Sequence, residues 1–193
     1  MNSLGVFCGS SLGVKSKYKE VAEKFGNLLA REGIRLVYGG GSVGIMGILA
    51  DAALRAGGEV VGVIPRALWN REVGHRGLTE LYVVETMHQR KSLMADLSDG
   101  FVALPGGIGT MEEIFEVWTW AQLGIHRKPC GLLEVDGFFA PLLAFINHMV
   151  AEGFLRPEHR FMLIAEHDSE VLLEGLRSYC PPAIPKWLDE GLN

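Results

Sequence analysis

The chain has 193 residues, of which 48% are hydrophobic and 21% are charged. This length and composition predict a single globular domain over residues 1–193, with enough apolar side chains for a substantial core. The formal net charge is −5, which gives no electrostatic reason to expect nucleic acid or an anionic membrane as a partner. An anionic small molecule would therefore have to be bound by local groups.

The cysteines and the apolar segments indicate a cytoplasmic protein without a membrane-spanning helix. Cys8, Cys130 and Cys180 are far apart and form no CxxC pair, as expected for reduced thiols in the cytosol. The start of the chain, MNSLGVFCGSS, lacks the charged segment and long apolar run of a secretory signal. The most apolar later region, residues 131–155, is interrupted by charged and polar residues and does not predict a membrane span.

Short apolar runs alternate with helical patterns along the chain. Several runs, such as VVGVI and FVALP, are apolar on both faces, which is typical of parallel strands covered by helices on both sides. The alternation predicts an α/β fold with a doubly wound parallel sheet, followed by an irregular, proline-rich tail at 181–193. Strands are expected at 4–7, 35–38, 60–64, 81–84, 100–104, 130–135 and 161–164, and helices at 16–32, 43–56, 87–97, 110–123, 138–151 and 168–178.

Glycine and small polar residues follow three of the predicted strands. The segments are FCGSS (7–11), YGGGSVG (38–44) and LPGGIGT (104–110). In doubly wound sheets, ligands bind beyond the carboxyl ends of the strands. One such turn would be a weak signal, because it also serves as a tight turn without a ligand. Three turns at one predicted edge favour a binding site there.

The loop at 104–110 has the features of a phosphate site. Gly106, Gly107 and Gly109 permit backbone conformations closed to other residues and let a ligand approach the main-chain N–H groups. Thr110 then opens a predicted helix. Free N–H groups and the helix dipole at such a start favour a phosphate.

The loop at 39–44 formally matches GxGxxG, the fingerprint of dinucleotide-binding proteins. That interpretation needs an acidic residue near the end of the next strand. The nearest acid, Glu59, precedes that strand, and the loop follows the second strand rather than the first. The pattern therefore disfavours an NAD(P)-dependent oxidoreductase, and its glycines are expected to let the turn pass close to a ligand or to the 104–110 loop.

Two acids, Glu112 and Glu113, lie at the start of the helix after Thr110. Thr110 and Glu113 have the spacing of a capping box, which would make Glu113 a structural residue. A carboxylate directly beside a phosphate is repulsive, so the acids should face another part of the ligand. A phosphorylated sugar fits both requirements, because a carboxylate beside a sugar can activate water or stabilise an oxocarbenium-like transition state.

Arg90 and Lys91 fall in the first turns of the predicted helix at 87–97, where the helix dipole disfavours cations. Arg90 also lies on the buried stripe of that helix, so its charge needs an anionic or polar partner. The sequence leaves two alternatives open, an ion pair inside the protein or a ligand in the cleft. The candidate internal partners are Glu72, Glu85 and Glu113.

Other site types find no support. The six histidines show neither HxxxH nor HExxH spacing, so no metal site is expected. The serines of the glycine-rich turns are not in a G-x-S-x-G context, so no Ser-His-Asp arrangement is predicted.

Taken together, four motifs resemble the LOG family, the cytokinin-activating phosphoribohydrolases. They are LVYGGGSVGIMG (36–47), MHQRK (87–91), PGGIGTMEE (105–113) and TWAQLGIHRKPCGLL (119–133). The resemblance runs from the FCGSS turn to about residue 165. PGGxGTxxE with the upstream arginine–lysine pair is its most specific part.

The resemblance implies a Rossmann-like fold, a homodimer, no cofactor, and hydrolysis of the N-glycosidic bond of a nucleoside 5′-monophosphate. The products would be ribose 5-phosphate and a free base, either adenine or an N6-substituted adenine. The implied catalytic residues are Arg90 and Glu113, with Glu112 as a reserve candidate for the acid. With the glycine loop, the expected substrate-binding residues are Glu72, Arg90, Lys91, Gly106, Gly107, Ile108, Gly109, Thr110, Met111, Glu112, Glu113 and Thr119.

Two further classes are kept beside the hydrolase and the oxidoreductase. A non-catalytic nucleotide sensor on the same fold would use the acids only as helix caps. A pyridoxal phosphate enzyme would account for the label "lysine decarboxylase" that proteins of this type often carry. However, no lysine stands in a context typical of a Schiff base, and 193 residues is short for that chemistry. The sequence does not identify the preferred base.

Overall fold

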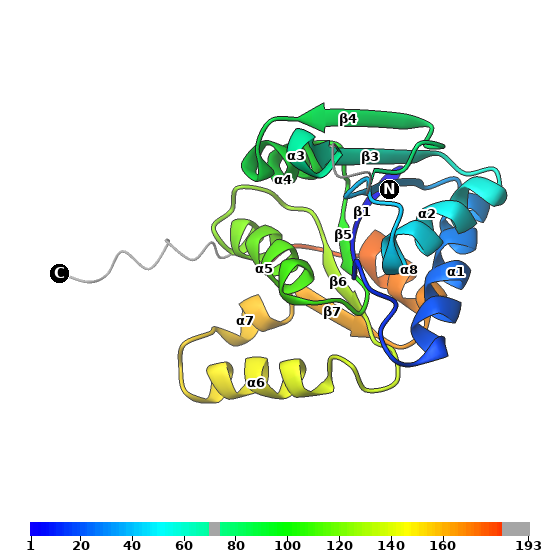
Figure 1. The fold of residues 1–193 in the computed structure, drawn as a ribbon. Coiled ribbons are helices and arrows are strands. Elements are labelled where there is room, and N and C mark those ends of the chain that lie inside the picture. The colour runs from blue at the N-terminus through cyan, green and yellow to red at the C-terminus, as the bar shows by residue number, and fades with distance from the viewer. Residues whose placement is uncertain (70–73, 183–193) are drawn as a thin grey trace.

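Within the residues that the computed structural model describes, 1–69 and 74–182, seven parallel strands form one sheet. In chain order they are β1 (Ser3–Phe7), β2 (Arg35–Tyr38), β3 (Val60–Pro65), β4 (Glu80–Val84), β5 (Phe101–Ala103), β6 (Cys130–Leu133) and β7 (Leu163–Glu166). Across the sheet their order is β4-β3-β2-β1-β5-β6-β7 (Figure 1).

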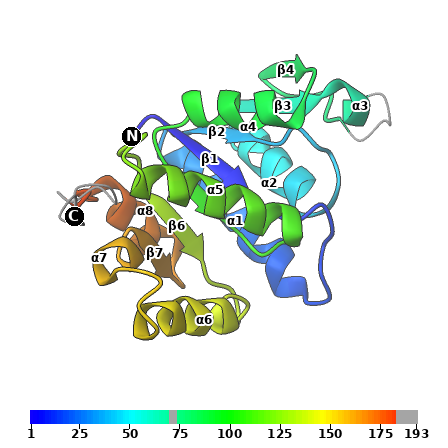
Figure 2. The ribbon, with the colours of Figure 1, turned by 90° about the vertical axis from the view of Figure 1, so that its left-hand side faces the viewer.

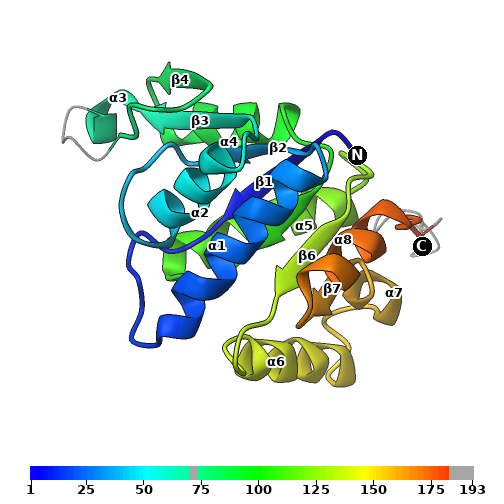
Figure 3. The same ribbon diagram turned by 90° about the vertical axis from the view of Figure 1, so that its right-hand side faces the viewer.

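Helices cover both faces of the sheet. α1, α2 and α8 lie on one face, and α4 to α7 lie on the other (Figures 2 and 3). The bounds are α1 (Ser16–Arg31), α2 (Gly44–Arg55), α3 (Arg66–Leu68), α4 (Met87–Asp96), α5 (Ile108–Gln122), α6 (Ala140–Ala151), α7 (Pro157–Arg160) and α8 (Ser169–Arg177). The predicted Rossmann-like, doubly wound α/β fold is confirmed.

The strand order reverses between β1 and β5. The chain builds outward from β1 to β4, then returns to pair β5 with the other edge of β1. The connections after β1 and β5 consequently leave on opposite sides of the sheet and open a crevice at its carboxyl edge. This is where the sequence placed the glycine-rich loops.

The central strands are apolar on both faces because each face meets its own helical layer. In β2, Leu36 and Tyr38 pack with α1 and α2, whereas Val37 packs with the side chains of α4 and α5. All three side chains are fully buried. Burial of one side chain of this size stabilises the fold by about 1.5–3 kcal/mol.

Two local predictions are wrong. The last strand runs from Leu163 to Glu166 rather than over 161–164, because the short helix α7 intervenes and leaves Phe161 exposed. Helix α5 begins at Ile108 with Gly107 as its N-cap and has no side-chain cap. Thr110 and Glu113 therefore do not form a capping box, since both already lie inside the helix.

The predicted tail falls mostly outside the described residues, which end at 182. Among the helices that the structure describes, none is both long and apolar enough to cross a membrane.

Candidate active site

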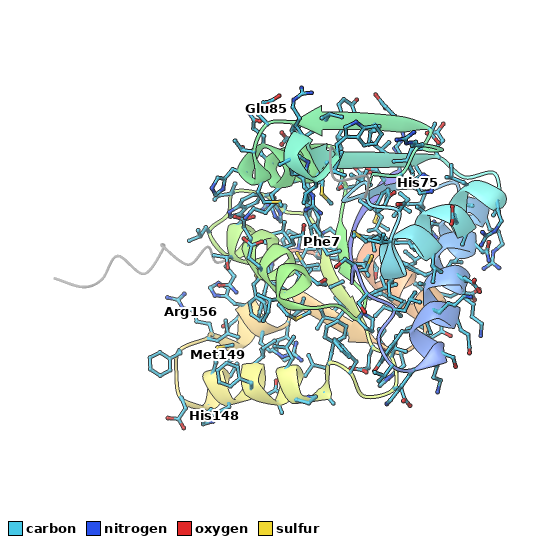
Figure 4. All side chains as sticks on the ribbon, viewed as in Figure 1. Phe7, His75, Glu85, His148, Met149 and Arg156 are labelled. Atoms are coloured by element: carbon cyan, nitrogen blue, oxygen red, sulfur yellow. The ribbon has the colours of Figure 1, made fainter. Side chains whose placement is uncertain are left out.

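A cavity of about 390 Å³ lies at the carboxyl edge of the sheet, next to the point where the strand order reverses. Figure 4 labels Phe7, the last residue of β1, in the middle of the molecule, and the loop after Phe7 forms part of the cavity wall. α2, α3, α4 and the start of α5 provide the rest. The lining residues are Cys8, Gly9, Ser10, Met46, Leu68, Met87, Arg90, Gly107, Ile108, Gly109, Thr110, Glu112 and Glu113.

An ion pair between Arg90 and Glu113 joins α4 to α5 in this cavity. Arg90 Nη2 lies 3.0 Å from Glu113 Oε1, and the two side chains are only 11% and 10% exposed. Arg90 Nη1 also contacts the sulfur of Met87 at 3.2 Å. Arg90 Nε is buried without a hydrogen-bond partner among the described residues. Arg90 therefore pairs inside the protein and also lines the cavity, whereas its contact with a ligand stays a prediction.

Gly39 explains why the loop after β2 is rich in glycine. A Cβ atom at this position would collide with Nη2 of Arg90. The bare backbone of the loop thus makes room for the guanidinium group that faces Glu113. Gly44, the last glycine of the formal GxGxxG pattern, has a different role, because its φ is positive and a Cβ there would collide with the backbone of Ser10.

The glycines before α5 leave the backbone accessible. None of Gly106, Gly107 and Gly109 has a positive φ, so these glycines do not adopt the left-handed conformations that they permit. A Cβ at Gly106 would collide with the side chain of Thr110. A Cβ at Gly107 or Gly109 would meet no other part of the protein within 4 Å. Side chains at these last two positions would instead occupy the space where a ligand approaches the backbone.

The first turn of α5 offers main-chain donors to that space. The helix starts at Ile108, and its first backbone bond runs from Met111 N to Gly107 O. The N–H groups of Ile108, Gly109 and Thr110 precede that bond and have no acceptor within the helix. With the helix dipole, they form a site for an anion such as phosphate.

Burial raises the pKa of the Glu113 carboxyl above its ordinary value. The guanidinium of Arg90 acts in the opposite direction, and the neighbouring carboxylate of Glu112 adds to the rise. Glu113 is therefore a sheltered carboxyl whose charge depends on its ionic neighbours, a property common among catalytic acids and bases.

Glu112 lies in a different environment from Glu113. Its side chain is 52% exposed and pairs with Lys91, whose Nζ is 2.5 Å from Glu112 Oε1. Lys91 is itself buried and also lies 3.0 Å from Glu116. Glu113, which is buried and faces Arg90, is thus the better candidate for the acid.

Four of the described residues that are expected to bind the substrate are absent from the cavity lining, namely Gly106, Lys91, Met111 and Thr119. Lys91 is buried, and Met111 is half-buried. Thr119 is exposed further along α5, where its hydroxyl donates to Phe115 O at 2.7 Å. Glu72 lies outside the described residues. The roles expected for all of the substrate-binding residues stay predictions.

Other lining residues were not among those expected. Cys8, Gly9 and Ser10 belong to the FCGSS turn, which the sequence marked only as a glycine-rich strand end. Apolar side chains also line the cavity, and no local pattern distinguishes them from core residues. These apolar side chains are Met46, Leu68 and Met87.

The part of the chain that the structure describes has no group of three histidine, cysteine, aspartate or glutamate side chains that could hold a metal ion.

Two of the solved structures with the same fold are described as molybdenum cofactor binding or carrier proteins. One is the molybdenum cofactor binding protein from Rippkaea orientalis, with a TM-score of 0.69, 22% identity, and coverage of 91% of this chain and 95% of that one. Another is the molybdenum cofactor carrier protein from Chlamydomonas reinhardtii, with a TM-score of 0.67, 20% identity, and coverage of 91% and 95%. At this identity the likeness concerns the fold alone.

Closer relatives identify the family. The family model described as "Possible lysine decarboxylase" matches residues 46–176. The cytokinin riboside 5′-monophosphate phosphoribohydrolase of Rhodococcoides fascians is 52% identical over 177 residues, which cover 91% of this chain and 89% of that protein. LOG7 of Arabidopsis thaliana, which has the same name, is 51% identical over 176 residues, covering 91% of this chain and 81% of LOG7. The chain therefore belongs to the LOG family, to which its glycine loop and arginine–lysine pair had pointed.

Proposed function

We propose that this protein hydrolyses the N-glycosidic bond of adenosine 5′-monophosphates, with or without an N6 substituent, and releases the free base and ribose 5-phosphate. The observation that carries the proposal is the buried pair of Arg90 and Glu113 beside the free amides of α5, within one cavity. Relatives about half identical to this chain are named for this reaction on cytokinin nucleotides.

In the proposed complex, the phosphate lies on the N–H groups of Ile108, Gly109 and Thr110. Glu113 lies one turn further along α5, so a ribose attached to that phosphate can reach its carboxylate. Nη2 of Arg90 is engaged with Glu113, and Nε is buried without a hydrogen-bond partner among the described residues. We assign Nε as the donor to the sugar or the base. This arrangement separates the phosphate from the acid, as the electrostatic argument from the sequence requires.

The chemical step breaks the bond between C1′ of the ribose and a nitrogen of the base. The two electrons of that bond leave with the base. Positive charge develops on the sugar, and the Glu113 carboxylate stabilises it. A water molecule then adds to C1′ and transfers one proton to Glu113, which passes it on to the departing base. Arg90 holds Glu113 in place throughout.

The cavity also contains a suitable surface for a purine. Met46, Leu68 and Met87 come from α2, α3 and α4 and line the same space as the polar groups. Flexible apolar side chains of this kind pack against aromatic rings. They support a base with or without an apolar N6 substituent.

Gly109→Ala is expected to separate stability from binding. An alanine at this helical position meets no other protein atom within 4 Å and should stabilise α5 by up to about 1 kcal/mol. Its methyl group would occupy the space assigned to the phosphate, so the affinity for AMP should fall at least tenfold. Urea denaturation and titration calorimetry measure the two effects. Gly106→Ala is the contrast, because its Cβ collides with Thr110 and should lower stability.

Chromatography of reaction mixtures tests the function itself. The purified protein is incubated with AMP, with isopentenyladenosine 5′-monophosphate and with the two ribosides that lack phosphate. Release of free base from the monophosphates alone is the expected result. Saturable binding of AMP without any release of base would instead favour a non-catalytic nucleotide sensor.

The proposal includes a homodimer in the cytoplasm. Half-buried aromatic side chains on α5, Phe115 and Trp120, support a further packing surface. Cys8 and Cys130 are buried free thiols, which supports a reducing compartment. Light scattering after size-exclusion chromatography measures the oligomeric state, and a monomer would contradict the dimer.

A further inference from the structure

Two consecutive cations on α4 pair with acids on α5 in different ways. Arg90 faces Glu113 inside the cavity, at 3.0 Å. Lys91 instead reaches Glu112 and Glu116, at 2.5 and 3.0 Å. Its side chain is only 8% exposed, so the lysine is a fixed part of the interface between the two helices rather than a mobile surface charge.

Glu112 needs a counter-ion because it borders the cavity. It follows the glycine loop directly and lines the same space as Glu113. A free carboxylate at this position could turn toward the phosphate site, or toward Glu113, and would repel either one. The bond from Lys91 draws Glu112 to the side of α5 where Glu116 lies.

The groups that face Glu113 form a nearly balanced cluster. Arg90 and Lys91 approach from α4, Glu112 and Glu116 lie on the same helix as Glu113, and the thiol of Cys8 lies at the end of β1. Removal of one cation leaves three carboxylates with a single positive charge. In a partly buried site such an imbalance disfavours the ionised form of Glu113.

We propose that Lys91 is a positioning residue that acts through Glu112 and Glu116: it keeps both carboxylates paired on the side of α5 that faces it and offsets their charge, so that Glu113 stays ionised while the enzyme works. The inference rests on the proposed function for its consequence in catalysis. Its structural part concerns the charge state of Glu113 and holds in the free protein.

The first test follows Glu113 directly. Carbon-13 NMR of the carboxyl groups in the full chain gives the pH at which Glu113 titrates. Lys91→Met should raise this midpoint by about one pH unit. Lys24→Met, on the opposite face of the sheet, removes the same charge from the exposed side of α1 and should leave the midpoint unchanged. An unchanged midpoint in Lys91→Met would overturn the inference.

A mutant cycle tests the route through Glu112. Glu112→Gln alone should lower the Glu113 midpoint, a measurement that does not depend on whether Lys91→Met folds. When Glu112 is already replaced by Gln, Lys91→Met should shift the Glu113 midpoint by half or less of the shift that it causes in the wild type. A full effect in the double variant would show that Lys91 acts on Glu113 without Glu112.

Turnover of AMP separates positioning from substrate binding. Lys91→Met should move the acidic limb of the pH profile of kcat/KM to higher pH. On that limb, each pH unit of displacement lowers kcat/KM about tenfold. At pH values above the limb, KM should be unchanged. Lys91→Arg should keep the limb near its original position. A higher KM at every pH would make Lys91 a substrate ligand and contradict the inference. Should the protein release no base at all, the proposed function fails while the NMR titration still decides the role of Lys91.

Discussion

Glu113→Gln is expected to lower kcat for AMP by about 10²–10⁴-fold, the contribution typical of a positioned acid or base. Glutamine keeps the size of the side chain and a hydrogen bond to Arg90, but it carries no charge to stabilise the sugar and accepts no proton from water. Nucleotide affinity should change little, because the phosphate is held by the amides of α5. Release of free base, followed by chromatography, and calorimetric titration with AMP measure the two quantities.

Glu112→Gln is the matched control for that variant. The two residues are neighbours of the same type, but Glu112 is half exposed and bound by Lys91. Its replacement should leave most of the turnover intact. Loss of turnover in Glu112→Gln, with activity retained in Glu113→Gln, would exchange the roles of the two acids.

The stability of Glu113→Gln should depend on pH in a defined direction. Burial raises the pKa of Glu113 in the folded state, so the folded protein keeps this proton to a higher pH than the unfolded chain. The contribution of the carboxyl to stability is therefore complete below its unfolded-state pKa and is lost as pH rises through the folded-state pKa. Glutamine has no such loss. In urea denaturation from about pH 4 upward, the free energy of unfolding of Glu113→Gln should rise relative to that of the wild type. If the difference between the two free energies did not change with pH, the raised pKa of Glu113 would be contradicted.

Much of the fold could be predicted because its signals are local and repeated. Five of the strands lie within one residue of their predicted positions at each end, and β6 begins where predicted. Runs such as VVGVI could be placed because they are apolar on both faces and match a sheet with two helical layers. The reversal of strand order follows from the same alternation together with the glycine-rich strand ends. The last strand was misplaced because Phe161 looks like a core residue in sequence but lies exposed after α7.

The site was harder to predict because its decisive interactions are between helices. The motif PGGIGTMEE marks a phosphate loop and two acids, but spacing alone favoured a capping box that the start of α5 at Ile108 excludes. In sequence terms Arg90 has three possible acidic partners, and only the packing of α4 on α5 selects Glu113. The absence of a side chain at Gly39 makes room for that arginine. The periodicity of the sequence does not reveal this contact.

Arg90→Met is expected to impair both catalysis and binding. Without the guanidinium, Glu113 loses the cation that favours its charged form, and the nucleotide loses the donor at the buried Nε. A loss of about 10²–10³-fold in kcat is typical when a group that stabilises developing charge is removed, and the Kd for AMP should rise as well. Arg31→Met, which removes an exposed arginine paired with Glu170 on the other face of the sheet, should leave both quantities unchanged.

Arg90→Lys distinguishes charge from geometry at the same position. Lysine restores the positive charge, but its single ammonium group cannot hold Glu113 and also present a separate donor in a fixed plane. The acidic limb of the pH profile should therefore return toward that of the wild type, while kcat stays low. A full return of kcat would mean that Arg90 acts through its charge alone, and the proposed contact between Nε and the nucleotide would then be wrong.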